Sequence, residues 1–127
     1  MQGWRMCMRK PTKYGNHKIT MGGIKFDSKK EAERWFILKD MERRREISDL
    51  ARQVKFVLIP FQRVETDEGT VTEQELAYIA DFTYRKGGRF VVEDVKGYRN
   101  PSDPAYRIFV MKRKMMLHFY KIKVKEI

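Results

Sequence analysis

Sulfur and imidazole ligands are almost missing from this sequence. Its 127 residues include one cysteine and two histidines. Cys7 alone cannot form an internal disulfide, and together with His17 and His118 it cannot supply the tetrahedral ligand set of a structural zinc site. We therefore expect any metal ion that the chain holds to be bound by oxygen atoms.

Long apolar segments are missing as well. No run approaches the roughly 20 residues that span a bilayer, and the first residues lack the apolar stretch of a secretory signal peptide. The sequence therefore predicts no membrane partner and a cytoplasmic location.

Charge is abundant but unevenly placed. The formal net charge is +11 and the pI is about 9.9. Residues 1–30 carry 8 basic and 1 acidic side chains and residues 95–127 carry 9 and 2, whereas residues 61–94 carry 4 and 8. A pI this high is typical of proteins that bind polyanions, although excess lysine can also serve solubility alone.

Length and composition indicate one folded unit. The hydrophobic fraction of 42% is enough to fill one core, and a chain of this length usually forms one domain. Residues 1–25 show no periodicity and are predicted to form a basic N-terminal arm, which leaves residues 26–127 as a single domain.

Local signals predict the first elements of that domain. Ser28 followed by Glu31 forms a capping box that begins a helix running to about Arg45. Residues 64–74 are predicted to form a surface loop or a ragged strand extension. Strands are predicted over residues 53–60, 76–86 and 89–97.

A second helix and a closing strand complete the predicted order. The helix begins at Pro104, after a cap supplied by Ser102 or Asp103. It runs to about Phe119, and the alternating residues 121–127 form the last strand. The order helix, three strands, helix, strand predicts an α/β fold with a single mixed sheet flanked by helices.

A glycine pair between the two later strands sets the position of two aspartates. Gly87 and Gly88 suit a two-residue type I′ turn, because both central positions need a positive φ. Counting outward from this turn places Asp81 opposite Asp94 on one face of the hairpin. Lys96 lies two positions beyond Asp94 and points to the same face.

The carboxylates of Asp81 and Asp94 repel each other at this spacing, and a cation bound between them would relieve the repulsion. At a separation of about 5 Å and an effective dielectric of about 20 they repel each other by roughly 3 kcal/mol. Mg²⁺ prefers carboxylates, waters and phosphate oxygens, so it would relieve this repulsion. A solvated pair with Lys96 neutralising part of the charge is the alternative. Glu93 competes with Asp94 as a ligand, but the alternation of side chains turns Glu93 to the other face.

A third acid lies on the first predicted helix. At about 100° per residue, Glu31 falls on the same stripe as Trp35 and Leu38, whereas Glu33 faces solvent. Glu31 is therefore the acid that lies next to the apolar stripe by which this helix is expected to pack on the core. Its alternative role is in the capping box, and the two roles are compatible.

Together these features resemble a known superfamily. A helix glutamate, then "IAD" on one strand and "VVEDVKG" on the next, followed by a helix and a strand, is similar to the PD-(D/E)XK nuclease superfamily. Within it, the chain from about Lys13 to Ile127 resembles small phage and prophage endonucleases related to Holliday-junction resolvases and transposon-end endonucleases. Ala80 occupies the position of the proline in the PD-(D/E)XK motif, so the sequence departs from the motif at this residue.

The resemblance implies a fold, a site and a chemistry. It implies a restriction-endonuclease-like core with Glu31, Asp81, Asp94 and Lys96 as the catalytic set. The three acids would hold one or two Mg²⁺ ions, for which Mn²⁺ would substitute, and Lys96 would orient the attacking water or contact the developing oxyanion.

The resemblance also implies a substrate and an assembly. The expected activity is metal-dependent hydrolysis of phosphodiester bonds in DNA by an endonuclease in the cytoplasm of a bacterial host. Branched or recombination DNA, such as a Holliday junction, is the expected substrate, and symmetric cutting of two strands implies a homodimer. A non-catalytic basic DNA-binding module that keeps the fold is the alternative.

Basic side chains supply the candidate phosphate contacts. Arg107, Lys114 and His118 fall on one polar stripe of the second predicted helix, which is either a DNA contact or a solvated face around the core. Met111, Met115, Met116 and Leu117 on the same helix are expected to fill the core. The predicted nucleic-acid-binding set is Lys13, Lys18, Arg107, Lys112, Arg113 and Lys114.

Overall fold

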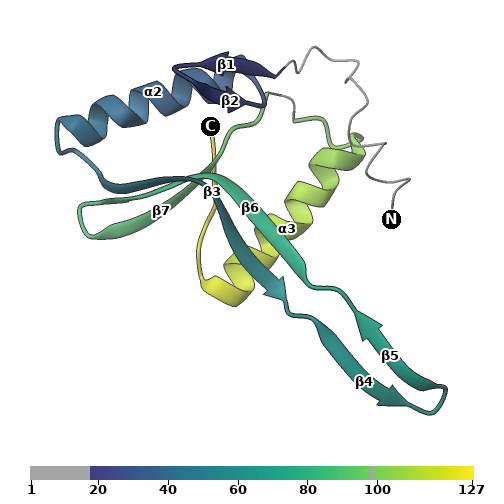
Figure 1. Cartoon of the computed structure of the whole chain (residues 1–127). Helices are drawn as coiled ribbons and strands as arrows, with labels where there is room; N and C mark the ends of the chain where they lie inside the picture. Colours follow the sequence, from purple (N-terminus) through teal and green to yellow (C-terminus); the bar gives the residue numbers. More distant parts are fainter. Residues whose placement is uncertain (1–17, 98) are drawn as a thin grey trace.

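A mixed four-stranded sheet with one helix against each face forms the body of the protein (Figure 1). The computed structural model describes residues 18–97 and 99–127. The elements in chain order are β1 (Ile19–Met21), β2 (Ile24–Phe26), α2 (Lys29–Arg43), β3 (Ser48–Ile59), β4 (Gln62–Thr66), β5 (Gly69–Glu73), β6 (Leu76–Lys86), β7 (Arg89–Asp94), α3 (Pro104–Tyr120) and β8 (Lys125–Glu126).

The sheet has the strand order β3-β6-β7-β8. The pairs β3–β6 and β6–β7 are antiparallel, whereas β8 lies parallel to β7. This arrangement confirms the predicted mixed α/β architecture, with α2 before the strands of the four-stranded sheet and α3 before its last strand. The prediction of a single sheet was wrong, because the strands form three separate sheets. Two further hairpins, β1–β2 and β4–β5, stand apart as separate two-stranded sheets.

Both helices begin where the local signals place them. The Ser28 hydroxyl accepts a hydrogen bond of 3.1 Å from the backbone N–H of Glu31 and starts α2. The side chain of Asp103, one of the two predicted caps, accepts a hydrogen bond of 3.2 Å from the backbone N–H of Tyr106. Pro104 is the first residue of α3. These side-chain oxygens satisfy N–H groups that have no partner within the helix. In the described ranges, no helix has the length and apolar character needed to cross a bilayer.

The Gly87–Gly88 turn forms as predicted. Both glycines have positive φ angles, of 57° and 79°. The β6–β7 ladder starts directly beside this turn and ends with the pair of Phe82 and Glu93. Asp81 and Asp94 therefore occupy the next position outward, where the ladder stops.

Two hydrophobic clusters fill the two faces of the sheet. The cluster under α3 contains Leu58, Tyr78, Ala80, Val92, Phe109, Met116 and Val124. The cluster under α2 contains Leu38, Ile47, Phe82 and Tyr84. Because a fully buried large apolar side chain contributes about 1.5–3 kcal/mol, apolar burial on both faces holds the helices to the sheet.

β6 changes the face that it presents at Asp81. Ala80 and Phe82 would share a face in a regular strand, yet they belong to the clusters on opposite sides of the sheet. Gln53, which lies across from this point on β3, has a left-handed φ of 52°. The paired strands therefore kink together at Gln53 and Asp81, at the position of the predicted site.

Several strand predictions need correction. Residues 19–26 form the β1–β2 hairpin, although residues 1–25 were predicted to form a basic N-terminal arm without regular structure. Residues 64–74, predicted to form a surface loop or a ragged strand extension, lie mostly in the regular β4–β5 hairpin. β3 begins at Ser48, well before residue 53, and β8 is confined to Lys125–Glu126. Backbone pairing with a neighbouring strand overrides the weak strand propensity of polar segments such as 48–53.

The packing of α3 also differs from expectation. Met116 is buried, but Met111 and Leu117, which were expected in the core, are exposed. The helix packs against the sheet through one face only, so apolar residues elsewhere on its circumference remain outside.

Candidate active site

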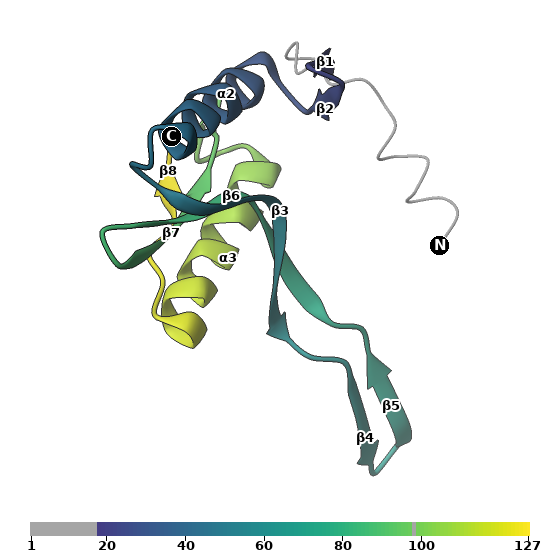
Figure 2. The ribbon, with the colours of Figure 1, turned by 60° about the vertical axis from the view of Figure 1, so that its left-hand side comes forward.

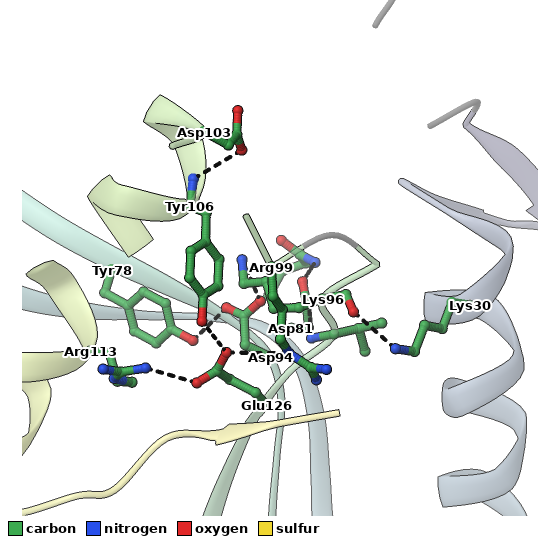
Figure 3. A network of polar contacts seen from close by, with 12 residues as sticks. Lys30, Tyr78, Asp81, Asp94, Lys96, Arg99, Asp103, Tyr106, Arg113 and Glu126 are labelled. Atoms are coloured by element: carbon green, nitrogen blue, oxygen red, sulfur yellow. Dashed lines mark hydrogen bonds and ion pairs between the residues drawn. The ribbon is translucent and has the colours of Figure 1, made fainter. Parts of the chain in front are cut away.

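A cavity of about 660 Å³ lies where both helices begin beside the sheet. The first turns of α2 and α3 line it, together with β6 and the end of β7. All four predicted catalytic residues contribute to its wall: Glu31, Asp81, Asp94 and Lys96. Figure 3 shows Asp81, Asp94 and Lys96 gathered in the space between the two helices.

Asp94 is held by two neighbours. Its side chain is buried, with the residue 5% exposed. The Tyr78 hydroxyl donates a hydrogen bond of 2.5 Å to Asp94 Oδ2, and Lys96 Nζ lies 3.0 Å from Asp94 Oδ1. The Lys96 ammonium also sits 4.0 Å from the centre of the Phe109 ring, a favourable cation–π contact. Lys96 is thus fixed on the same side of the sheet as Asp94, as the alternation of side chains predicted.

Asp81 sits at the kink between β3 and β6. The backbone N–H of Val95 donates a hydrogen bond of 2.8 Å to Asp81 Oδ2, and Gln53 Nε2 lies 3.4 Å from Asp81 Oδ1. Burial and the neighbouring charge of Asp94 raise the pKa of Asp81 to about 7. The two carboxylates are therefore close enough to oppose each other's ionisation, which is the repulsion that the hairpin register predicted.

Glu31 faces the same cavity from α2. It is 3% exposed, and burial followed by the charge of Asp27 raises its pKa. Arg52 Nη2 lies 3.7 Å from Glu31 Oε1, yet this oxygen accepts no hydrogen bond from any residue that the structure describes. Glu33 is exposed, as the helical stripe predicted. A buried carboxylate oxygen without a donor is costly unless some other group compensates it.

Positive charge surrounds these acids. Lys18 and Lys30 line the cavity beside Lys96, and Lys30 Nζ donates a hydrogen bond of 2.9 Å to the Lys96 carbonyl. The N-terminal turns of α2 and α3 add the positive ends of two helix dipoles. The cavity therefore combines carboxylates in its wall with cationic groups that favour an anion at its mouth.

Glu93 belongs to the other face of the sheet. It is fully buried and receives two hydrogen bonds from Arg34, of 2.9 and 2.6 Å, and a third from the Tyr84 hydroxyl. It does not line the cavity of the other acids. Its ion pair ties α2 to β7, so Asp94 is the acid of this strand that faces the candidate site.

Comparison with known proteins gives a family but no relative of known activity. The family described as "Protein of unknown function (DUF1064)" matches residues 11–127. The chain belongs to the DUF1064 family. No curated protein and no solved structure is similar enough to this DUF1064 chain to count as a match.

The donor set of the DUF1064 cavity suits a hard cation bound through few protein ligands. Within residues 18–97 and 99–127, no three His, Cys, Asp or Glu side chains are grouped so that they could hold a metal ion. Mg²⁺ commonly uses one or two carboxylates and completes its shell with water and substrate phosphate. Asp81 and Asp94 fit that pattern, and Glu31, whose Oε1 accepts no hydrogen bond from the described residues, lines the same cavity.

The predicted nucleic-acid contacts are dispersed. Lys18 is exposed at the cavity, whereas Arg107, Lys112 and Lys114 lie on α3. Arg113 Nη1 donates a hydrogen bond of 2.9 Å to Glu126 Oε2 and is thereby engaged within the fold. Lys13, like the rest of residues 1–17, lies outside the described residues.

Sequence reasoning missed three residues of the site. Gln53 and Tyr78 contact the two aspartates, and Lys30 contacts the backbone of Lys96. Tyr78 could have been found, since it lies on the same strand as Asp81. Gln53 could not, because its contact depends on a left-handed backbone that nothing in the local sequence signals.

Proposed function

We propose that this chain is a Mg²⁺-dependent endodeoxyribonuclease with a restriction-endonuclease-like core, acting on branched DNA. The observation that carries the proposal is the convergence of Asp81 on β6, Asp94 at the end of β7 and Lys96 just after it, in one cavity with Glu31. A structural role alone gives no reason for the partly buried Asp81 to face the buried Asp94, because the arrangement costs free energy.

The side chains divide the chemistry among them. Asp81 and Asp94 would hold Mg²⁺, with Glu31 facing them. When bound, Mg²⁺ supplies charge neutralisation at the phosphate and acidifies a water molecule. Lys96, held 3.0 Å from Asp94 Oδ1, would orient the attacking water or contact the phosphate oxygen that gains charge. Tyr78 keeps Asp94 in position by donating to its other oxygen.

The surroundings favour a phosphate at the mouth of the cavity. Lys18, Lys30 and the first turns of both helices offset the negative carboxylates. The net charge of +11 adds long-range attraction for a polyanion. The preference for branched DNA, action as a homodimer and function in phage or prophage recombination rest on the resemblance of the sequence to junction-cutting nucleases.

Cleavage of a labelled substrate panel tests this proposal. The panel contains a four-way DNA junction, a linear duplex of the same sequence, single-stranded DNA and RNA, each with Mg²⁺, with Mn²⁺ or with a chelator. We expect divalent-dependent internal cuts, fastest on the junction. Equal or faster cutting of the linear duplex would remove the preference for branches, and no cutting under any condition would remove the nuclease.

Two acids on α2 provide a matched control. Glu31→Gln changes an acid in the cavity, whereas Glu33→Gln changes an exposed acid two positions away. We expect the first substitution, like Asp94→Asn and Lys96→Ala, to lower cleavage at least 100-fold while DNA binding persists. Glu33→Gln should cleave like the wild type.

One observation favours a second candidate, a DNA-binding module without catalysis. The described residues contain no group of three potential metal ligands. This alternative predicts salt-sensitive DNA binding with no divalent-dependent hydrolysis. It also predicts no thermal stabilisation by Mg²⁺ or Mn²⁺, whereas an ion that binds the folded site must stabilise it.

A further inference from the structure

The β4–β5 hairpin projects away from the body of the protein as an arm, defined here as residues 61–75 (Figures 1 and 2). Every residue of the arm is exposed. A two-stranded hairpin is marginally stable by itself in water, and its two outer edges present unpaired backbone groups. An arm of this kind gains stability when another surface covers it.

One face of the arm carries a pair of valines, although a hairpin that is solvated on both faces needs no apolar residue. Val64 and Val71 lie directly opposite each other, and Val64 is 51% exposed. Phe61 is exposed at the base of the arm. Cross-strand valines help to hold the two strands together, but they leave an apolar surface facing outward.

The charge of the arm narrows the choice of partner. Residues 61–75 contain five acidic side chains and one basic side chain, in a chain whose net charge is +11. One basic and five acidic side chains give the arm a net charge of −4. Phosphate groups repel a segment with this charge, so the arm is unsuited to binding nucleic acid. It suits a protein surface that is both basic and apolar.

The outer side of α3 is such a surface. Ile108, Met111 and Phe119 are exposed, with Met111 at 56%, and their spacing places them on one stripe of the helix. Arg107 and Lys112 flank this stripe, and residues 104–120 contain no acidic side chain. We call the three exposed apolar residues the α3 stripe.

We infer that the arm of one copy of this chain docks on the α3 stripe of a second copy. Valines would meet the apolar stripe while the acidic groups of the arm meet its basic flanks, a match in both hydrophobicity and charge. A two-fold axis makes the contact reciprocal, so each copy gives one arm and receives one. Arg107 and Lys112 then serve the dimer rather than DNA. The inference stands whether or not the chain cleaves DNA.

Sedimentation velocity of the full chain, over a range of concentrations, tests the inference. We expect the wild type to dimerise, with weaker association at high salt because part of the attraction is between charges. An arm variant, Val64→Thr with Val71→Thr, and a stripe variant, Ile108→Ser with Met111→Ser, should each raise the dimer Kd at least tenfold. Ile37→Ser is the matched control, because Ile37 is exposed on α2 away from both surfaces.

Mixing the two variants gives the sharper test. In a heterodimer, the wild-type arm of the stripe variant meets the wild-type stripe of the arm variant, so one of the two contacts is intact. In a homodimer of either variant, both contacts contain a substituted surface. We therefore expect the mixture, with one variant carrying a fluorescent label, to associate more tightly than either variant alone.

Three results would overturn the inference. These are a monomeric wild type, variants that dimerise like the wild type, and a mixture that associates no better than its components. A monomer whose arm variant loses affinity for duplex DNA would show that the arm binds nucleic acid instead. Circular dichroism checks folding, and if the arm variant fails to fold, the stripe variant and its control decide the question.

Discussion

The Tyr78 hydroxyl donates a hydrogen bond of 2.5 Å to Asp94 Oδ2, joining two strands of the sheet at the candidate site. Burial, followed by the charge of Asp94, raises the pKa of Tyr78 well above its usual range. The hydroxyl therefore stays protonated and can only donate to this carboxylate. The other oxygen of this carboxylate, Oδ1, lies 3.0 Å from Lys96 Nζ.

Removing this hydrogen bond should impair catalysis more than binding. A hydrogen bond to a charged group contributes about 1.5–3 kcal/mol, which corresponds to a change of roughly 10- to 100-fold. We expect Tyr78→Phe to lower the single-turnover rate of Mg²⁺-dependent cleavage by this factor. DNA affinity, measured in the presence of a chelator, should change little.

Tyr84→Phe is the matched control for Tyr78→Phe. The Tyr84 hydroxyl also donates to a buried carboxylate, but that carboxylate is Glu93 on the opposite face of the sheet. We expect Tyr84→Phe to lower the free energy of unfolding without lowering the rate of cleavage. Equal loss of cleavage in both variants would mean that Tyr78 acts through general stability.

The raised pKa of Asp81 predicts how stability depends on pH. Burial and the charge of Asp94 raise this pKa from 3.8 to about 7. Between pH 3.8 and about 7, Asp81 has lost its proton in the unfolded chain but keeps it in the folded chain. The contribution of Asp81 to the free energy of unfolding therefore falls as pH rises through this range. The fall ends where Asp81 ionises in the folded chain as well. Each pKa unit corresponds to about 1.4 kcal/mol.

Asp81→Asn removes this titration. We expect the variant and the wild type to have similar stability near pH 4, and the variant to be more stable at pH 8 by on the order of 2–4 kcal/mol in the absence of divalent ions. Urea denaturation at a series of pH values measures the difference. A variant that is less stable than the wild type at pH 8 would contradict the prediction.

Much of the site could be predicted because short-range signals determine it. Gly87–Gly88 fixes the turn, the turn fixes the register, and the alternation of side chains then places Asp94 and Lys96 together and sends Glu93 to the other face. The cap at Ser28 likewise fixes where α2 starts and hence which face carries Glu31. Each of these steps depends on residues that are close in the sequence.

The remainder depends on contacts between distant segments. The kink that joins Asp81 to β3 needs a left-handed Gln53, an unusual conformation for a residue other than glycine. The exposure of Met111 depends on which face of α3 the sheet covers, and a list of apolar residues does not reveal it. Every residue of the β4–β5 hairpin is exposed, so its sequence lacks the apolar alternation of a half-buried strand and predicted a surface loop or a ragged strand extension.

Arg34 is predicted to be essential for stability and dispensable for chemistry. It makes two hydrogen bonds to Glu93, a fully buried carboxylate that α2 and β7 enclose. Removing one partner of a buried ion pair costs about 3–5 kcal/mol. We therefore expect Arg34→Ala to lower the free energy of unfolding by this amount in chemical denaturation.

Arg43→Ala is the comparison for Arg34→Ala, since Arg43 pairs with Asp40 on the exposed side of the same helix. An exposed pair contributes about 0–1 kcal/mol, so this variant should be almost as stable as the wild type. Similar losses in both variants would show that the burial of Glu93 is not what makes the Arg34 contact strong.

Gln53 is predicted to support the geometry of the candidate site while lowering the stability of the folded chain. Its left-handed φ of 52° costs about 1–2 kcal/mol for a residue with a Cβ atom, and glycine adopts this conformation freely. Gln53→Gly should therefore raise thermal stability while lowering cleavage, because the contact of Nε2 with Asp81 Oδ1 is lost.

Arg45→Gly separates the two effects of that substitution. Arg45 has a similar φ of 62° just after α2, and it lies outside the cavity that holds Asp81. Relief of backbone strain should raise its melting temperature as well, but the rate of cleavage should not change. If Gln53→Gly also cleaves at the wild-type rate, the side chain of Gln53 has no part in the site, and its strained backbone serves only the kink that sets the position of Asp81.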